Sequence, residues 1–257
     1  MPENDLSLLI DAARRASEEA KAFIGRDLGV ENKAADNSPV TRADLAVDRM
    51  LRESLLDARP RYGWLSEETP DDHARLDQEA TFIVDPIDGT RAFIDGQKTW
   101  AHSLAVARGG VVTAGVVYLP MLDLLYTATT GAGAHLNGRP ISVSGTDTLD
   151  AAEVLATKPT LDARHWPRGV PAVKRAHRPS LAYRLGLVAE GRFDAMLTLR
   201  PAWEWDIAAG SLIMAEAGAT VTDRRGGPLR FNRPHPQTDG MLGANPALHA
   251  AFLDRMT

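Results

Sequence analysis

The sequence has no cysteine, no long apolar run and no surplus of basic residues, and each absence excludes a class of function. Without cysteine the chain can form no disulfide, no thiolate metal site and no cysteine nucleophile. No run of about 18 apolar residues occurs, so we expect no transmembrane helix and no integral membrane partner. The net charge of -5 argues against nucleic-acid polymers as partners, because it supplies no basic field.

The beginning of the chain also lacks a targeting signal. Residues 1–23 show neither the basic start nor the apolar centre of a signal peptide. Together with the absence of cysteine, this predicts a cytoplasmic protein. The chain has 257 residues, of which 44% are hydrophobic, so it can bury one large core or two small ones.

Apolar spacing predicts two helices near the N-terminus. The first is expected over Asp5–Ile24, where apolar residues recur on one face. The second is expected to begin at Thr41, because Thr41 and Asp44 have the spacing of a capping box.

The pattern then changes to short strands. Apolar runs begin at Tyr62, and Gly109-Gly110 and Asn137-Gly138 are typical hairpin turns, so we predict an antiparallel meander. Small and polar residues mark a boundary over 143–150, after which strands and helices alternate. One of these helices is expected over Asp206–Ala217.

We therefore predict an α+β protein with two parts. Residues 1–145 would form an N-terminal α+β half that binds metal, and residues 146–257 a smaller α/β half that completes the active site.

The densest chemical motif follows an apolar strand and reads Asp85-Pro86-Ile87-Asp88-Gly89-Thr90. Proline fixes the chain and glycine permits an unusual backbone angle, so both carboxylates and the carbonyl of Ile87 can point to one place. Hard divalent cations such as Mg²⁺ prefer such oxygen ligands, and the amides after Gly89 would suit a phosphate. Taken alone, the motif could also be a strand end, a helix cap and a turn.

Three further acidic positions are weaker signals by themselves. Glu67 and Glu68 follow another short strand, where adjacent acids usually form a solvated edge. Asp206 opens a helix and could be a simple N-cap, as Asp44 could be in its capping box.

Taken together, four motifs resemble the inositol monophosphatase family in order and spacing over nearly the whole chain. They are NSPVTRAD (37–44), SEET (66–69), DPIDGT (85–90) and WDIAAG (205–210). The resemblance implies a layered αβαβα sandwich, with an N-terminal antiparallel sheet and helices plus the smaller C-terminal half. It also implies a homodimer and inhibition by lithium.

The resemblance further implies the roles of single residues. Two or three Mg²⁺ ions per site would be held by Glu67, Asp85, the carbonyl of Ile87, Asp88 and Asp206, with Asp85 bridging. Glu67, Thr90 and Asp44 would orient the attacking water. The substrate contacts would come from Asp88, Gly89, Thr90, Asp206 and Ser180.

The resemblance implies hydrolysis of the phosphate monoester of a small metabolite by metal-activated water, and within the family it favours 3'-phosphoadenosine 5'-phosphate as the substrate. ADNSPVT (35–41) and LVAEG (187–191) resemble the 3'(2'),5'-bisphosphate nucleotidase branch, which would convert 3'-phosphoadenosine 5'-phosphate to AMP and phosphate. However, Ala182 stands where that branch commonly has lysine, and DPIDGTRAF (85–93) also resembles histidinol phosphatases. Inositol 1-phosphate is the third candidate ester.

Other residues have both an ordinary and a functional interpretation. The basic residues over 174–178 and Arg184 could bind a second anionic group, or they could belong to a solvated loop. Trp203 could contact the substrate, whereas Trp205 is expected to pack beneath Asp206. The seven histidines have no metal-ligand spacing and are expected to lie in the core or on the surface. The alternative from another class is a non-catalytic regulatory binding protein.

Overall fold

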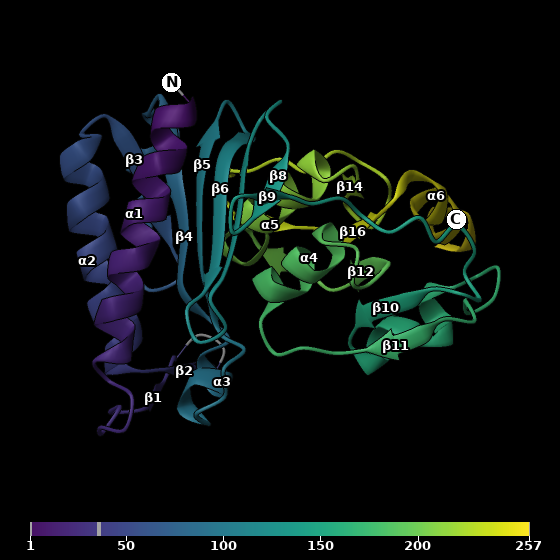
Figure 1. The fold of residues 1–257 in the computed structure, drawn as a ribbon, viewed down its shortest axis with the longest axis horizontal. Helices are drawn as coiled ribbons and strands as arrows, with labels where there is room; N and C mark the ends of the chain where they lie inside the picture. The colour runs from purple at the N-terminus through teal and green to yellow at the C-terminus, as the bar shows by residue number, and fades with distance from the viewer. Residues whose placement is uncertain (1, 35–36, 257) are drawn as a thin grey trace.

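The computed structural model describes residues 2–34 and 37–256 of the chain. Figure 1 shows five layers, which alternate between helices and sheets from the N-terminal to the C-terminal side. This is the α+β layered sandwich that the sequence predicts. Residues 35 and 36, which belong to the ADNSPVT motif, lie outside the described residues.

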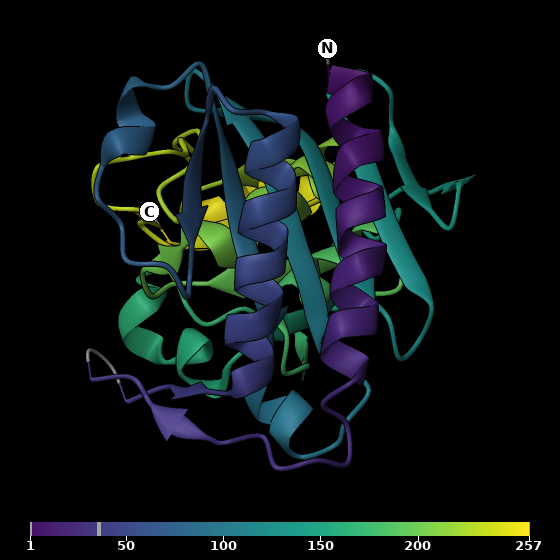
Figure 2. The ribbon, with the colours of Figure 1, turned by 90° about the vertical axis from the view of Figure 1, so that its left-hand side faces the viewer.

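The first layer consists of α1 (Pro2–Lys21) and α2 (Arg42–Ala58), which lie side by side across one face of the large sheet (Figure 2). Helix α1 ends earlier than predicted, and Ile24 beyond it is 47% exposed. The start of α2 is as predicted. Thr41 is its N-cap, and the complete capping box with Asp44 is present.

The large sheet has seven strands in the order of the chain. They are β3 (Tyr62–Ser66), β4 (Ala80–Asp88), β5 (Ala101–Arg108), β6 (Val111–Leu119), β7 (Leu124–Thr129), β8 (Ala134–Leu136) and β9 (Arg139–Pro140). The hairpin turns after β5 and β8 lie at Gly109-Gly110 and Asn137-Gly138, where the sequence predicts them.

The prediction of a wholly antiparallel sheet is wrong at its first pair. Strand β3 runs parallel to β4, and only the later pairs are antiparallel. The segment between them has no hairpin signal and crosses over through a short 3₁₀ helix, η1 (Ala74–Asp77). A crossover connection returns the chain in the same direction, which only a parallel pair can accommodate.

The next layers are a helical pair and a second sheet. Helices α4 (Leu181–Ala189) and α5 (Glu204–Glu216) pack between the two sheets (Figure 1). The second sheet has the order β11-β10-β12-β16-β14. Its strands are β10 (Glu153–Ala156), β11 (Lys174–Ala176), β12 (Ala195–Thr198), β14 (Thr220–Thr222) and β16 (Met241–Ala244), and α6 (Pro246–Met256) covers its outer face.

Glycines allow α5 to approach its neighbours closely. A Cβ atom on Gly115 of β6 would lie 3.0 Å from the carbonyl oxygen of Ala209, and one on Gly210 would lie 2.3 Å from Leu185. The close packing fixes the position of α5 between α4 and the large sheet, and Asp206 lies on its first turn.

The remaining elements are short. They are β1 (Glu31–Asn32), β2 (Pro39–Val40), α3 (Thr90–Ile94), β13 (Ala202–Trp203), β15 (Gln237–Thr238), η2 (Lys158–Leu161) and η3 (Ala163–His165). The predicted division at residue 145 falls between β9 and β10, and it stays a prediction. No helix of the described residues is both long and apolar enough to cross a membrane.

Candidate metal centre

The parallel pair of strands brings the first two acidic residues together. Ser66 is the register partner of Val84, so Glu67 and Asp85 follow at the same edge of the sheet. The backbone amide of Glu67 donates to the carbonyl of Val84 at 3.2 Å. The parallel pairing of β3 with β4 therefore brings together Glu67 and Asp85, which are 18 residues apart in the chain.

The third acidic residue comes from helix α5. The hydroxyl of Ser103 on β5 donates to the carbonyl of Trp205 at 3.0 Å, and Ser103 is the register partner of Asp85. This contact holds the first turn of α5 against the sheet. Carboxylate oxygens of Glu67, Asp85 and Asp206 consequently lie within 4.8 Å of one another.

Burial and mutual repulsion make this cluster a site for a cation. Burial raises the pKa of Asp85 and of Asp206 well above the usual value, and the neighbouring carboxylates raise both further. The Oδ1 atom of Asp85 is buried and has no hydrogen-bond partner. A set of hard oxygen donors with an unsatisfied buried member fits Mg²⁺.

Asp88 lies near the cluster but is held differently. Its Oδ2 atom accepts hydrogen bonds from the Ser180 hydroxyl at 2.6 Å and from the Ala182 amide at 2.6 Å. Its charge nevertheless raises the pKa of Asp85 and Asp206, so it lies close to both. Its role as a metal ligand stays a prediction.

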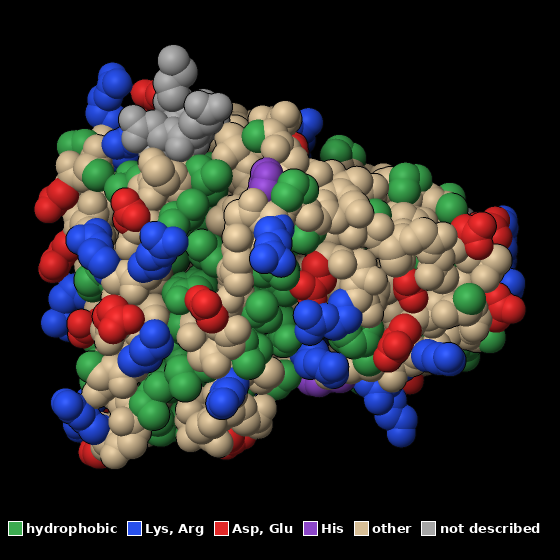
Figure 3. All heavy atoms as spheres, viewed as in Figure 1, with side chains coloured by type: hydrophobic (Ala, Val, Ile, Leu, Met, Phe, Trp, Pro, Cys, Tyr) green, Lys and Arg blue, Asp and Glu red, His purple; other side chains and the backbone are tan. Residues whose placement is uncertain are grey.

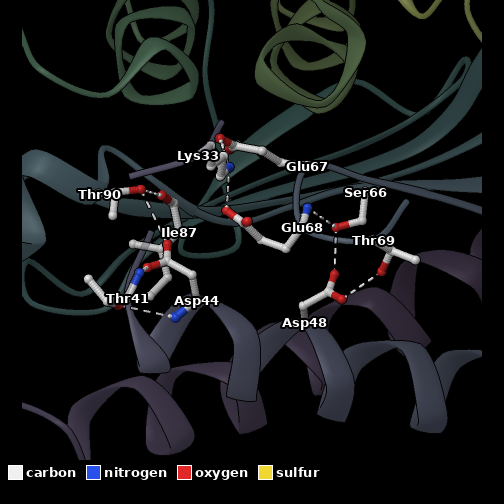
Figure 4. Close-up of polar contacts among 10 residues, drawn as sticks. All are labelled: Lys33, Thr41, Asp44, Asp48, Ser66, Glu67, Glu68, Thr69, Ile87 and Thr90. Atoms are coloured by element: carbon white, nitrogen blue, oxygen red, sulfur yellow. Dashed lines mark hydrogen bonds and ion pairs between the residues drawn. The ribbon is translucent and has the colours of Figure 1, made fainter. Parts of the chain in front are cut away.

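The other members of the DPIDGT motif meet helix α2. The Thr90 hydroxyl lies 3.2 Å from Oδ1 of Asp44 and 3.2 Å from the carbonyl oxygen of Ile87 (Figure 4). Gly89 has φ = 96°, in the left-handed region that favours glycine, and it precedes α3. The structure thus brings together Asp44, Thr90 and the Ile87 carbonyl, and their roles in catalysis and metal binding stay predictions.

The carboxyl group of Asp44 is buried and strongly hydrogen-bonded. Burial raises its pKa to about 6, although hydrogen bonds from Thr41 oppose this shift. Its Oδ2 atom accepts from the Thr41 amide at 2.8 Å and from the Thr41 hydroxyl at 2.5 Å. Asp44 is thus both the N3 member of the capping box of α2 and a partner of Thr90.

The model of the inositol monophosphatase family matches residues 1–256. The chain belongs to this family. Its members are phosphatases, so the protein is a metal-dependent phosphoric monoester hydrolase, and the acidic cluster is compatible with Mg²⁺.

Individual members of the family align with this chain along most of their length. An inositol-1-monophosphatase of Rhizobium meliloti is 36% identical over 241 residues, which are 86% of this chain and 87% of that protein. The Nus factor SuhB of Salmonella typhimurium is 32% identical and covers 98% of this chain and 95% of its own. The solved IMPase of Thermotoga maritima has a TM-score of 0.83 at 28% identity, covering 100% of this chain and 97% of its own.

This inositol monophosphatase family member has a lysine at the acidic cluster that the sequence motifs do not contain. The Nζ atom of Lys33 lies 2.6 Å from Oε1 of Glu67 and 2.8 Å from Oε1 of Glu68 (Figure 4). Burial opposes the charge of Lys33, but Glu67 and Glu68 outweigh burial and raise its pKa. A lone lysine in a loop gives no sequence signal for this role.

Burial also affects the second acid of the pair. It raises the pKa of Glu68 to about 7, and the charge of Glu67 adds to the shift. Lys33 opposes the shift through its hydrogen bond and its charge. The ammonium group thus partly neutralises one side of the acidic cluster.

Asp48 fixes the segment that carries Glu67. It lies one turn after Asp44 on α2, and its two oxygens accept from the hydroxyls of Ser66 at 2.5 Å and Thr69 at 2.7 Å (Figure 4). The indole of Trp64 also donates to Thr69 at 3.1 Å. Residues four apart on a helix lie on the same face, so the spacing of Asp44 and Asp48 is the sequence signal that places Asp48 on the same side of α2 as Asp44.

His102 supports the backbone of the DPIDGT motif. Its Nδ1 atom lies 2.5 Å from the carbonyl oxygen of Pro86, and burial lowers its pKa to about 4. A neutral imidazole that donates from Nδ1 is consistent with this contact. The expectation that the histidines are core or surface residues holds for His102, which also positions the motif.

The start of α5 differs from the prediction. The helix begins at Glu204 and Trp203 is at the N-cap, so Asp206 is not a capping residue. Trp203 and Trp205 stack with ring centroids 4.6 Å apart, and Trp205 packs against the central core. Glu204 is buried and accepts from the amide of Asn232 at 2.6 Å, which anchors the first turn.

Proposed function

We propose that the protein hydrolyses a phosphate monoester of a small polar metabolite with the help of Mg²⁺, and that inositol 1-phosphate is its first candidate substrate. The observation that carries this proposal is the meeting of three carboxylates within 4.8 Å. The substrate candidate rests on the inositol-1-monophosphatase of Rhizobium meliloti, which is 36% identical to this chain.

The side chains present would divide the metal binding as follows. Glu67, Asp85 and the carbonyl of Ile87 would hold one ion, and Asp85, Asp88 and Asp206 a second, with two or three ions in all. Bound Mg²⁺ lowers the pKa of water and neutralises charge on the leaving oxygen. Asp85 would contact both ions, which fits its unpartnered Oδ1 atom.

Thr90 and Asp44 would orient the attacking water. The Thr90 hydroxyl can donate to Oδ1 of Asp44, which leaves its own lone pairs to accept a hydrogen from water. Because the pKa of Asp44 is about 6, its carboxylate is ionised and able to accept at neutral pH. Glu67 would hold the same water from the other side, and the amides after Gly89 would contact the phosphate.

A second candidate substrate is 3'-phosphoadenosine 5'-phosphate. Arg175 and Arg178 form no ion pair with any described carboxylate, and they lie in the segment that leads to Ser180. Figure 3 shows Lys and Arg side chains gathered in the lower middle of this face of the molecule. Such a group of cations would suit a substrate with a second phosphate.

The deciding experiment compares the turnover of three esters by the purified protein, with and without saturating Mg²⁺. The esters are inositol 1-phosphate, 3'-phosphoadenosine 5'-phosphate and histidinol phosphate, and the Asp206→Asn variant is the inactive control. We expect release of inorganic phosphate only with Mg²⁺, and fastest from inositol 1-phosphate. Preference for the nucleotide would favour the second candidate. Absence of turnover on all three would refute the proposed substrates.

The alternative of a regulatory binding protein can be tested in the same assay. One relative is named as a Nus factor, and it is 32% identical to this chain. A protein that binds Mg²⁺ and an ester without releasing phosphate would favour this alternative. A cytoplasmic location, a homodimer and inhibition by lithium also belong to our proposal, and light scattering would test the homodimer.

A further inference from the structure

A buried arginine without an acidic partner lies beside the metal centre. Arg75 and Arg184 are the two buried arginines of the described residues, with 2% and 7% exposure. Arg75 pairs with Asp71 at 2.7 Å, whereas Arg184 forms no ion pair with a carboxylate in the described part of the chain. A buried cation is costly unless its hydrogen bonds are satisfied, so the partners of Arg184 indicate its purpose.

The guanidinium of Arg184 binds the segment that precedes its own helix. Its Nε atom donates to the carbonyl of Arg178 at 2.5 Å, and an Nη2 hydrogen points to the carbonyl of Pro179 at 3.3 Å. The same Nη2 atom lies 2.8 Å from Nε2 of His177. Residues 177–179 are therefore tied to the second turn of α4.

The next residue along the chain is Ser180, which connects this segment to Asp88. Its hydroxyl donates to Oδ2 of Asp88 at 2.6 Å and also accepts from the amide of Tyr183 at 3.0 Å. The amide of Ala182 donates to the same Asp88 oxygen at 2.6 Å. The direction of the Asp88 carboxylate thus depends on how the chain enters α4.

We propose that Arg184 is a positioning residue for Asp88. By holding residues 177–179, it places the Ser180 hydroxyl and the first amides of α4 where they fix the Asp88 carboxylate beside the acidic cluster. This inference rests on the proposed function, in which Asp88 helps to hold Mg²⁺. Partners that orient metal ligands in this way commonly contribute about 10- to 100-fold to metal affinity or activity.

Charge alone would make a different prediction. If Arg184 acted only through its positive charge near Asp88 and Asp206, its loss would make the site more negative and tighten Mg²⁺ binding. Lysine at this position would then restore the parent behaviour. In the positioning mechanism, lysine fails to restore it, because one ammonium cannot bridge the carbonyls of residues 178 and 179 as the planar guanidinium does.

The test is a double-mutant cycle on Mg²⁺ affinity, measured by titration calorimetry without substrate. We expect Arg184→Met and Ser180→Ala each to weaken Mg²⁺ binding by about tenfold. Because both act through Asp88, the double variant should bind within about twofold of the weaker single variant. Multiplied effects in the double variant, or an unchanged affinity in Arg184→Met, would overturn the proposal.

Further variants separate this inference from general destabilisation and from the proposed function. Arg255→Met removes an arginine bond to the carbonyl of Arg168 away from the site, and it should leave Mg²⁺ binding unchanged. If Arg184→Met does not fold, Arg184→Lys replaces it in the cycle. The kcat of Arg184→Met should fall about tenfold with less change in KM. If the parent binds Mg²⁺ but hydrolyses none of the esters, the proposed function fails, and the affinity cycle still tests the positioning role.

Discussion

Asp85→Asn should make the metal-free protein more stable, although it removes a proposed ligand. Asp85 is 1% exposed, and its Oδ1 atom has no hydrogen bond to lose. Two carboxylates whose oxygens lie within 4.8 Å of each other repel by at least about 3.5 kcal/mol at an effective dielectric constant of about 20. Lys33 offsets Glu67, and the hydrogen bonds from Ser180 and Ala182 offset part of the charge of Asp88. We therefore count only the pair with Asp206 and expect a gain of about 3 kcal/mol in the free energy of unfolding.

The sign of the pH dependence follows from the raised pKa of Asp85. When the pKa of a carboxyl group is higher in the folded state than in the unfolded state, the group makes its full contribution to the stability of the fold below the unfolded pKa of about 3.9. That stability is lost as the pH rises through the folded pKa. The advantage of Asp85→Asn should therefore grow from pH 5 to pH 8.

The assay is thermal unfolding after chelation, followed by titration with Mg²⁺. For a chain of this size, 3 kcal/mol corresponds to a rise in Tm of about 6–12 °C at pH 7.5. Saturating Mg²⁺ should stabilise the parent by about 2.7 kcal/mol at 100 times its Kd and leave the variant nearly unchanged. A metal-free variant that melts at or below the Tm of the parent at pH 7.5 would refute the electrostatic reasoning.

The remaining predictions concern three other residues. Asp88→Asn should reduce the rate of phosphate release to less than about a tenth of the parent rate, because a lost metal ligand weakens transition-state binding. The circular dichroism spectrum should be unchanged. A higher residual rate would refute the assignment of Asp88 as a ligand. Lys33→Met should raise the pKa of Glu68 above its value of about 7, which NMR titration can measure, because the ammonium no longer favours the carboxylate. Asp48→Ala removes the hydrogen bonds to Ser66 and Thr69 and should lower kcat by about tenfold. Asp57→Ala, at the exposed end of α2, is the control and should leave kcat unchanged.

The sequence alone determined the features that depend on near neighbours. The capping box of Thr41 and Asp44 spans four residues, and the turn at Gly109-Gly110 joins adjacent strands, so spacing and residue type suffice to predict both. The DPIDGT motif by itself allows two interpretations, a cation site or a strand end followed by a helix cap and a turn. The family resemblance, and not residue spacing, linked Glu67, Asp85 and Asp206 before their geometry was known.

Tertiary structure alone decided how these residues meet and what supports them. The parallel pairing of β3 with β4 places Glu67 beside Asp85, and no local pattern encodes the direction of a strand after a crossover. Lys33 and Arg184 belong to the site through contacts with residues distant in the chain, or through bonds to backbone carbonyls that any sequence offers. Such contacts depend on packing across the whole molecule, and for that reason periodicity and motifs do not reveal them.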